Sequence, residues 1–391
     1  MKENSVIIIG AGIAGSSLAY YLNKKKWDIC LIDKEKPGNL NIYGNPAVAV
    51  YPSFMLNNLS YNKLMSLSIK HTWSLLNTLK FSSEECQMCG AIDLYDGDEG
   101  EKRNSIIRKR SPETKELYKL YNAKKIESLC GIKKKVGFYY KLGGWVSPLA
   151  LCENLTKNKA IKKNFDTKVL KINKLLNGWE VLTNNQKLYA KNIVLSSAID
   201  IKNFEDSKHL SVHSSRGQVN WVKHNNKSNT LLALNGYHIP NVGSKSIIGS
   251  TYSLDNTNKF ISSLDFKKNI KTFTSLSSGL EPDSMKPDDG WVGFRACSYD
   301  RNPYVGKLLD QNRLPQDERV NIDELSWVDG LYVNSCYNSR GFSFATYTSS
   351  CLSNLMNDDL SNNEKITLNY LNPERRFLKS IGLKKKLAAK F

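Results

Sequence analysis

Long apolar runs are missing from this sequence, and cysteines are few. No stretch approaches the roughly 18 apolar residues that a membrane-spanning helix needs, so we expect no membrane partner. The eight cysteines are scattered over 391 residues, which suits a reducing compartment better than a disulfide framework. Cys86 and Cys89 form a C-x-x-C pair, but no second pair stands at a spacing that would complete a four-ligand zinc site. We therefore predict a cytoplasmic protein without a metal site.

Acidic residues are also scarce. The chain has 37 Asp and Glu against 56 Lys and Arg, a formal net charge of +19. Lys outnumbers Arg about four to one, which indicates AT-rich codons, but such codons favour Glu as well and do not produce this charge alone. We expect a polyanionic partner. The basic clusters, each of which taken singly is more often a solvated face, are Arg108-Lys109-Arg110, Lys133-Lys134-Lys135, Lys162-Lys163 and Lys384-Lys385-Lys386.

The strongest motif lies in the first 33 residues. An apolar run, Val6–Ile9, leads into Gly10, Gly12 and Gly15. Gly10 would let the backbone leave a strand sharply, Gly12 would let a pyrophosphate approach, and Gly15 would let the following helix pack close to the sheet. The N–H groups at the start of that helix would face the phosphates.

An acidic residue completes this motif. A second apolar run, Ile29–Ile32, ends in Asp33, about where a carboxylate would accept hydrogen bonds from a ribose. A glycine triplet alone is weak evidence, but the flanking strands and the acid make a dinucleotide site the favoured interpretation over a structural turn. The fold class predicted here is a Rossmann-like α/β domain.

Small residues and helical periodicity organise the next part of the chain. The apolar loop from Pro37 to Pro52 would let backbone N–H groups reach a planar ring, although an ordinary buried connection fits it nearly as well. Further along, the patterns predict helices over 61–79, within 99–121 and after Pro148, strands over 89–95, 137–140, 166–172, 179–183 and 192–197, and a turn at 143–145. The small residues that end 192–197 again suit close approach to a ligand.

The second half of the chain changes character. Several strands joined by turns between Val212 and Tyr252 predict an antiparallel sheet, with a helix over 265–276 lying on it. A strand over 331–334 and a helix opening at Asn338-Ser-Arg340-Gly341-Phe342 follow. That helix N-terminus is a second candidate site for an anion or a carbonyl oxygen.

Together these pieces resemble the D-amino-acid-oxidase-like family of flavin amine oxidases, over nearly the whole chain. Within it, the chain is most similar to the FAD-dependent half of bacterial bifunctional enzymes that modify the wobble uridine of tRNA. The matching residues are Gly44-Asn45 with Tyr51-Pro52, Gly143-Gly144-Trp145 with Ser147-Pro148, Arg216-Gly217-Gln218, Gly293 to Arg295 with Asp300 and Pro303, and Ser339-Arg340-Gly341. The chain departs from the family at Ala47-Val48, where Gln-Gly is usual.

The resemblance implies a discontinuous architecture and a set of site residues. Residues 1–85, 145–208 and 290–391 would form the FAD-binding domain, and 86–144 and 209–289 an α+β substrate domain built on a mostly antiparallel sheet. FAD would be held by Gly10, Gly12, Gly15, Asp33, Asn45, Val48, Val169, Arg340, Gly341 and Phe342. Arg295 would face a substrate carboxylate, with a structural ion pair as the other interpretation. Tyr237 and Tyr252 are weaker pocket candidates, for which core packing is the simpler interpretation.

The resemblance also implies a reaction. The 5-carboxymethylaminomethyl group of the wobble uridine, or its 2-thio form, would be oxidised by FAD at the methylene beside the carboxylate, and water would release glyoxylate and leave an aminomethyl group. Because the chain begins at the first strand, we expect oxidation only; a separate methyltransferase acting on the product is a possible partner. The alternatives are a small-molecule amine oxidase of the glycine or sarcosine type, which would not need the basic clusters, and a flavin- or RNA-binding protein without catalysis.

Overall fold

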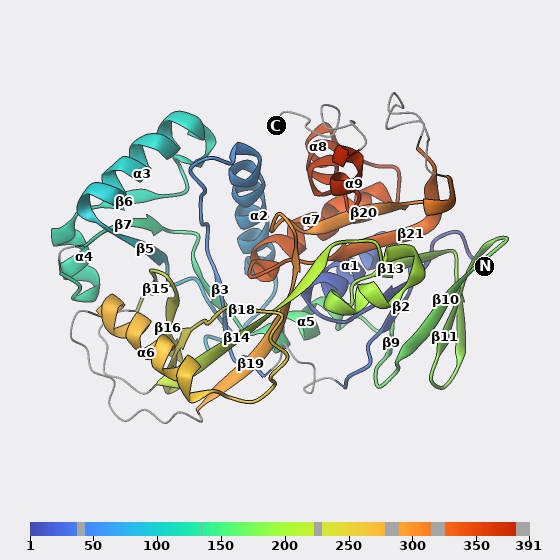
Figure 1. Cartoon of the computed structure of the whole chain (residues 1–391), viewed down its shortest axis with the longest axis horizontal. Helices are drawn as coiled ribbons and strands as arrows, with labels where there is room; N and C mark the ends of the chain where they lie inside the picture. The colour runs from blue at the N-terminus through green and yellow to red at the C-terminus, as the bar shows by residue number, and fades with distance from the viewer. Residues whose placement is uncertain (37–43, 134, 223–228, 278–288, 314–324, 381–391) are drawn as a thin grey trace.

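The computed structural model describes residues 1–36, 44–133, 135–222, 229–277, 289–313 and 325–380. Two lobes lie side by side in Figure 1, with a mainly parallel sheet on the right and a large antiparallel sheet on the left. The basic cluster Lys384–Lys386 and most of the loop after Pro37 lie outside the described residues. In the described part of the chain, no helix is long and apolar enough to cross a membrane, and no three His, Cys, Asp or Glu side chains gather in a way that could hold a metal ion.

The right-hand lobe is built on a six-stranded sheet. Its strand order is β20-β21-β13-β1-β2-β9, and all neighbours are parallel except β20, which pairs antiparallel with β21. The bounds are β1 Ser5–Ile9, β2 Asp28–Ile32, β9 Ile161–Asn164, β13 Asn192–Leu195, β20 Tyr304–Leu309 and β21 Trp327–Ser335. The order changes direction around β1, which places a crevice at the carboxyl ends of β1 and β13.

Both faces of this sheet are covered at its centre, where every residue of β1 and β13 is buried. Val6 and Ile8 of β1 belong to a core shared with helices, whereas Ile7 and Ile9 pack on the opposite side with Trp179. The opposite side is a three-stranded antiparallel sheet made of β10 Val169–Leu175, β11 Gly178–Thr183 and β12 Lys187–Ala190. Such two-sided burial explains why the strand reads as a continuous apolar run rather than an alternating one.

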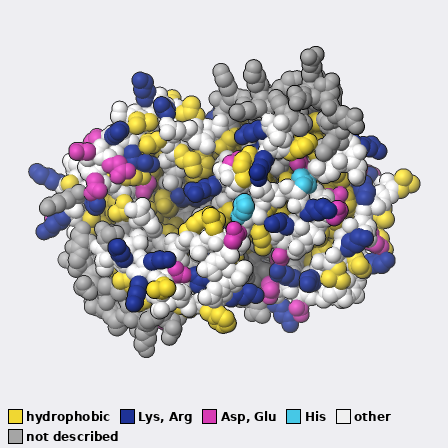
Figure 2. Space-filling model, viewed as in Figure 1, with side chains coloured by type: hydrophobic (Ala, Val, Ile, Leu, Met, Phe, Trp, Pro, Cys, Tyr) yellow, Lys and Arg dark blue, Asp and Glu magenta, His cyan; other side chains and the backbone are white. Residues whose placement is uncertain are grey.

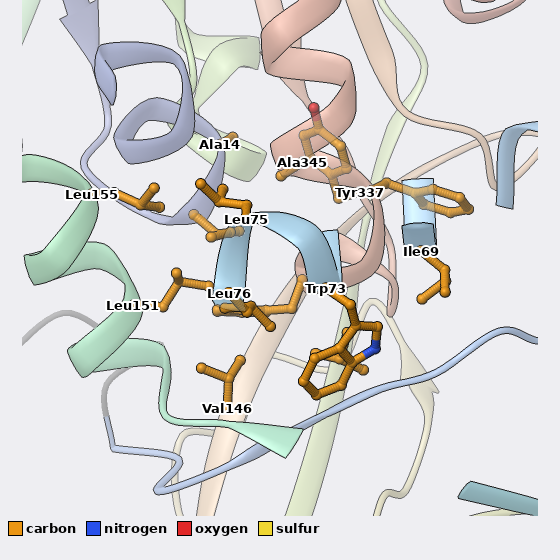
Figure 3. Close-up of a cluster of buried hydrophobic side chains, with 14 of the residues drawn as sticks. Ala14, Ile69, Trp73, Leu75, Leu76, Val146, Leu151, Leu155, Tyr337 and Ala345 are labelled. Carbon is orange, nitrogen blue, oxygen red and sulfur yellow. The ribbon is translucent and has the colours of Figure 1, made fainter. Parts of the chain in front are cut away.

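The helical core lies between the two lobes. Leu76 of α2 points toward Leu151 of α5, and Leu75 lies on the side of Ala14 of α1 (Figure 3). Helices of the described chain are α1 Ile13–Lys24, α2 Leu59–Thr78, α3 Gly97–Arg110, α4 Ala123–Cys130, α5 Pro148–Thr156, α6 Ser263–Ser277, α7 Gly341–Leu355, α8 Asn362–Leu371 and α9 Arg375–Ser380. Helices α1 and α7 pack against each other, and this contact brings an early and a late segment of the chain to one site.

The left-hand lobe is a nine-stranded sheet. Its order is β18-β14-β17-β16-β15-β5-β7-β6, with β19 also paired to β14. Every pairing is antiparallel except that of β15 with β5. The bounds are β5 Ala91–Asp96, β6 Lys119–Tyr121, β7 Lys135–Tyr140, β14 Val212–Val222, β15 Leu231–Ala233, β16 Tyr237–Val242, β17 Lys245–Gly249, β18 Ser253–Leu254 and β19 Gly290–Ser298. The antiparallel sheet and its covering helix α6 are thus confirmed.

Two local predictions were wrong. The segment 119–121 is the edge strand β6 and not helix, because its pairing with β7 overrides a charged local sequence. The supposed turn at 143–145 contains most of β8, Gly144–Val146, which pairs with β3, Val48–Val50, and with β4, Cys86–Gln87. This small sheet joins segments that the sequence separates by almost 100 residues. By contrast, the helix start at Pro148 is as predicted, with Ser147 capping α5.

Candidate cofactor and substrate site

One cavity of about 830 Å³ lies between the two lobes. It opens at the carboxyl ends of β1, β2 and β13 and extends to β14 and β19 of the large sheet. The predicted site residues that line it are Gly10, Gly12, Asp33, Asn45, Val48, Val169, Tyr237, Tyr252, Arg295, Arg340, Gly341 and Phe342. Residues that are far apart in the sequence therefore meet in one space, whose volume fits a large ligand.

The glycine turn after β1 is shaped by close approach. Gly10 has φ +109°, and a Cβ there would overlap the backbone of Ser196 at the end of β13. Gly12, the N-cap of α1, faces open space at the cavity. Gly15 does not line the cavity, because it packs under the Gly10 carbonyl and Ile8, where a Cβ would not fit. The turn thus aims the N-terminus of α1 into the cavity, as an anion site requires.

Asp33 follows β2 at the same edge. Its Oδ2 accepts the Ala11 N–H at 2.7 Å, and its Oδ1 accepts the Glu35 N–H at 3.0 Å. Burial raises the pKa of this carboxyl above its usual value, while the two N–H donors oppose the rise. The carboxylate is thus fixed in the cavity wall, with lone pairs left to accept hydroxyl groups.

Several buried polar atoms at the cavity wall lack a partner. Asn45 Oδ1, Ser196 Oγ, Ser197 Oγ and Asn338 Oδ1 are buried and have no hydrogen bond within the described part of the chain. An unsatisfied buried polar atom is costly, about 1–3 kcal/mol each. Four of them around one cavity indicate a ligand rich in donors and acceptors, which a nucleotide cofactor is.

A positively charged side chain, Arg340, lies where α7 begins. The Arg340 guanidinium lies 5.0 Å from the Tyr51 ring centre, and its charge opposes the rise that burial causes in the pKa of Tyr51 and of Tyr61. Burial opposes the charge on Arg340, but these tyrosines and Asp93 keep its pKa above the usual value. Asp93 in turn accepts the Tyr95 hydroxyl at 2.6 Å. This network holds a positive charge at the cavity beside the start of a helix.

Arg295 of β19 occupies the far end of the cavity. Its Nη2 donates to Ser250 Oγ at 2.6 Å and its Nη1 to the Thr251 carbonyl at 3.4 Å. Within the described residues, no carboxylate forms an ion pair with it, so the interpretation as a structural ion pair finds no support there. The guanidinium stands over Gly217, where a Cβ would collide with it. Arg295 is therefore a charge held by neutral oxygens, with N–H groups left for a bound anion.

The two predicted tyrosines flank Arg295. Burial raises the pKa of Tyr237, although the nearby Arg295 and Ser250 side chains oppose the rise. The Tyr252 ring lies 6.0 Å from the Arg295 guanidinium, and its pKa is also raised by burial. Both phenols stay protonated at neutral pH. They are hydrogen-bond donors rather than bases.

Residues 5–355 match the family of flavoproteins that is named DAO and described as "FAD dependent oxidoreductase". The chain belongs to this family. Its cofactor is FAD, and the glycine turn, Asp33 and the cavity's polar atoms that have no partner among the described residues fit that cofactor. The predicted family, fold class, cofactor and enzyme class are thus confirmed.

Relatives and solved structures agree with this assignment. The "tRNA 5-methylaminomethyl-2-thiouridine biosynthesis bifunctional protein MnmC" of Methylobacillus flagellatus is 26% identical over 98% of this chain and 61% of its own length. MnmC of Chromobacterium violaceum is 25% identical over 97% of the chain and 60% of its own length. The chain thus spans about three fifths of these relatives.

The fold has close structural counterparts. Glycine oxidase from Bacillus cereus has a TM-score of 0.72 at 16% identity, covering 92% of this chain and 96% of that one. L-proline dehydrogenase from P. horikoshii has a TM-score of 0.77 at 14% identity, covering 96% and 98%. At these identities the likeness establishes the fold.

Some cavity residues carried no signal in the sequence. Ser250, which with Thr251 outside the cavity wall holds Arg295, and Trp291, which fills the space over Gly44 and Gly293, come from ordinary turns and strands. Asp300, part of the motif after Arg295, does not line the cavity, because it forms an ion pair with Arg375 at 2.7 Å. The small residues Ser196 and Ser197, by contrast, line the cavity as their position after a buried strand predicted.

Proposed function

We propose that this oxidoreductase acts on an N-substituted glycine carried by tRNA. The substrate would be the 5-carboxymethylaminomethyl group of uridine or 2-thiouridine at the wobble position, and the products an aminomethyl group and glyoxylate. MnmC, whose name states a role in the biosynthesis of a modified tRNA uridine, supports the substrate class. A methyltransferase acting on the product is the expected next step.

The observation that carries the proposal is that Arg295 lines the cavity without a carboxylate partner among the described residues. A guanidinium that is bound only by neutral oxygens among the described residues can grip a carboxylate through two parallel hydrogen bonds. Its position on β19, across the cavity from the glycine turn, would set the methylene beside that carboxylate toward the cofactor. Tyr237 would add a neutral donor next to it.

The bond changes follow from this arrangement. FAD, when bound, supplies a two-electron oxidant for a C–H bond beside nitrogen. The substrate R–CH2–NH–CH2–COO⁻ loses a hydride and a proton and becomes the imine R–CH2–N=CH–COO⁻. Water then adds to the imine carbon, and the C–N bond breaks to give R–CH2–NH2 and glyoxylate.

The amine must be neutral to lose a hydride. Arg295 and Arg340 place two positive charges at the cavity, and both disfavour an ammonium there. Apolar side chains such as Val219 and Phe342 line the same space, and desolvation acts in the same direction. The chain's own charges therefore lower the pKa of a bound amine, and the proposal assigns no general base.

The surface charge favours a polyanionic substrate. Lys and Arg side chains spread over both lobes on the face shown in Figure 2. Some are neutralised, as Lys162 is by Asp28 at 2.9 Å and Lys135 by Asp96 at 2.6 Å. The three basic residues that end α3, Arg108 to Arg110, form no ion pair with the described residues.

We also propose that the chain divides into an FAD-binding part, 1–85, 145–208 and 290–391, and a substrate part, 86–144 and 209–289.

The experiment that tests the function is nucleoside analysis of tRNA carrying the carboxymethylaminomethyl group before and after incubation with the holoprotein. Conversion to the aminomethyl nucleoside supports the proposal. Unchanged tRNA, together with oxidation of free glycine or sarcosine, would favour the small-molecule amine oxidase.

A further inference from the structure

Exposed apolar side chains gather at the mouth of the cavity. Leu254, Phe260 and Leu264 are 60%, 80% and 68% exposed, and Tyr252 is 49% exposed. All four lie on the segment that joins β17 to α6 or on the first turn of that helix. Tyr252 and the exposed Lys259 also line the cavity, so this segment forms part of its rim. Such a concentration of apolar surface beside a site indicates a contact with a partner.

The segment is held in place from beneath. Arg216 of β14, only 1% exposed, donates to the carbonyls of Asn258 and Phe260, each at 2.6 Å, and forms an ion pair with Asp265. Gln218 Oε1 accepts the Ser262 N–H at 2.7 Å. Buried polar side chains thus fix the backbone that presents Phe260 to solvent, and a backbone that is already ordered loses little entropy on binding.

Positive charge predominates on this segment, although the exposed Asp255 lies within it as well. Lys259 lies within it, and Lys267 and Lys268 stand exposed on the first turns of α6, at the lower left in Figure 1. The nearby carboxylate of Asp265 is engaged by the buried Arg216, and its other oxygen lies 3.7 Å from the Lys268 ammonium. Lysines beside an exposed aromatic ring are the chemistry that binds single-stranded nucleic acid, in which bases stack on rings and phosphates meet cations.

We propose that this rim surface, made of Leu254, Phe260, Leu264, Lys259, Lys267 and Lys268, docks the single-stranded loop of an RNA substrate. A base beside the one that enters the cavity stacks on Phe260, and neighbouring phosphates meet the lysines. The inference rests on the proposed function, because the reacting base must leave its stack to reach Arg295. A small amine would use none of these residues.

The test uses holoprotein and an anticodon stem-loop RNA with the modified uridine and 2-aminopurine beside it. Wild-type protein should quench the 2-aminopurine on binding. Phe260→Ala should bind about 5- to 150-fold more weakly, the range for removing one ring on which a base stacks, with an unchanged dependence on salt. Phe260→Tyr should bind like the wild type, and Lys267→Ala with Lys268→Ala should instead lower the slope of log affinity against log salt by roughly 0.7 for each phosphate no longer neutralised.

Tyr189→Ala is the matched control, since Tyr189 is a 53% exposed aromatic on β12, in the other lobe. It should bind RNA like the wild type, and all variants should keep their FAD and reduce it equally with the free modified nucleoside. If Phe260→Ala binds and oxidises the RNA with wild-type affinity, the rim surface is wrong and the proposed function stands. If wild-type protein neither binds nor oxidises the RNA, the function itself is wrong.

Discussion

Replacing Arg295 by lysine separates the shape of the proposed carboxylate site from its charge. Arginine offers two parallel N–H donors to a carboxylate, whereas lysine offers one charged donor on a flexible chain. Ser250 and Thr251 hold the guanidinium through one hydrogen bond each, so its direction is fixed before substrate binds. Arg295→Lys keeps the charge at the cavity and loses this direction.

The size of the effect follows from the number of hydrogen bonds that each variant can still donate to the carboxylate. A hydrogen bond to a charged group contributes about 1.5–3 kcal/mol. Losing one of two such bonds, about 2 kcal/mol, predicts roughly thirtyfold slower flavin reduction at saturating substrate. Arg295→Ala removes both bonds, and roughly a thousandfold decrease is expected. Affinity for tRNA should change little, because most of it comes from phosphate contacts elsewhere.

Anaerobic stopped-flow spectroscopy measures the rate of flavin reduction directly, through the decrease in flavin absorbance after mixing with carboxymethylaminomethyl-tRNA. The variants should contain as much FAD as the wild type, because Arg295 lies at the far end of the cavity from the glycine turn. Wild-type reduction rates in both variants would refute the reasoning, since the substrate would then be oriented by other residues.

Three further predictions concern the same chain. Gly217→Ala should slow flavin reduction like Arg295→Lys, because its Cβ would push the Arg295 guanidinium out of the position that Ser250 and Thr251 hold; normal reduction kinetics would contradict this. FAD should leave with the supernatant on acid precipitation, since burial raises the pKa of the cavity thiol Cys336 to about 12 and makes it a poor nucleophile; flavin retained in the pellet would point to that residue. Burial raises the pKa of Asp300, but Arg375 outweighs burial and lowers this pKa to about 2. The ion pair therefore stabilises the fold fully when the pH is above the ordinary carboxyl pKa, and this stabilisation is lost as the pH falls from that pKa toward 2. The difference in unfolding free energy between wild type and Asp300→Asn should therefore shrink by about 2 kcal/mol between pH 6 and pH 2, and a constant difference in urea titrations would exclude the ion pair as its cause.

The cofactor half of the site could be predicted because its determinants are local. Gly10, Gly12 and Asp33 lie within one strand-helix-strand unit, where the required backbone and side chains follow one another in the sequence. Gly10 illustrates this, since its φ of +109° and its contact with Ser196 both demand glycine. The residues that FAD requires there can be recognised without the rest of the fold.

The substrate half depends on pairing between distant strands. The role of Ser250 as the partner of Arg295 arises because β14 lies between β17 and β19, and no local pattern records that order. The same reason explains why 119–121 was misjudged as helix, since its strand conformation comes from pairing with β7. Propensity and periodicity describe a segment and not its neighbours across a sheet.

The most direct test of the central claim is a single turnover without oxygen. Holoprotein is mixed with excess tRNA that carries the carboxymethylaminomethyl group, and reduced flavin, glyoxylate and the product nucleoside are measured in the same sample. The account predicts one glyoxylate and one aminomethyl nucleoside for each flavin reduced, and no reduction by the same tRNA without the carboxymethyl group. Flavin that stays oxidised with this tRNA but is reduced by free glycine or sarcosine would contradict it.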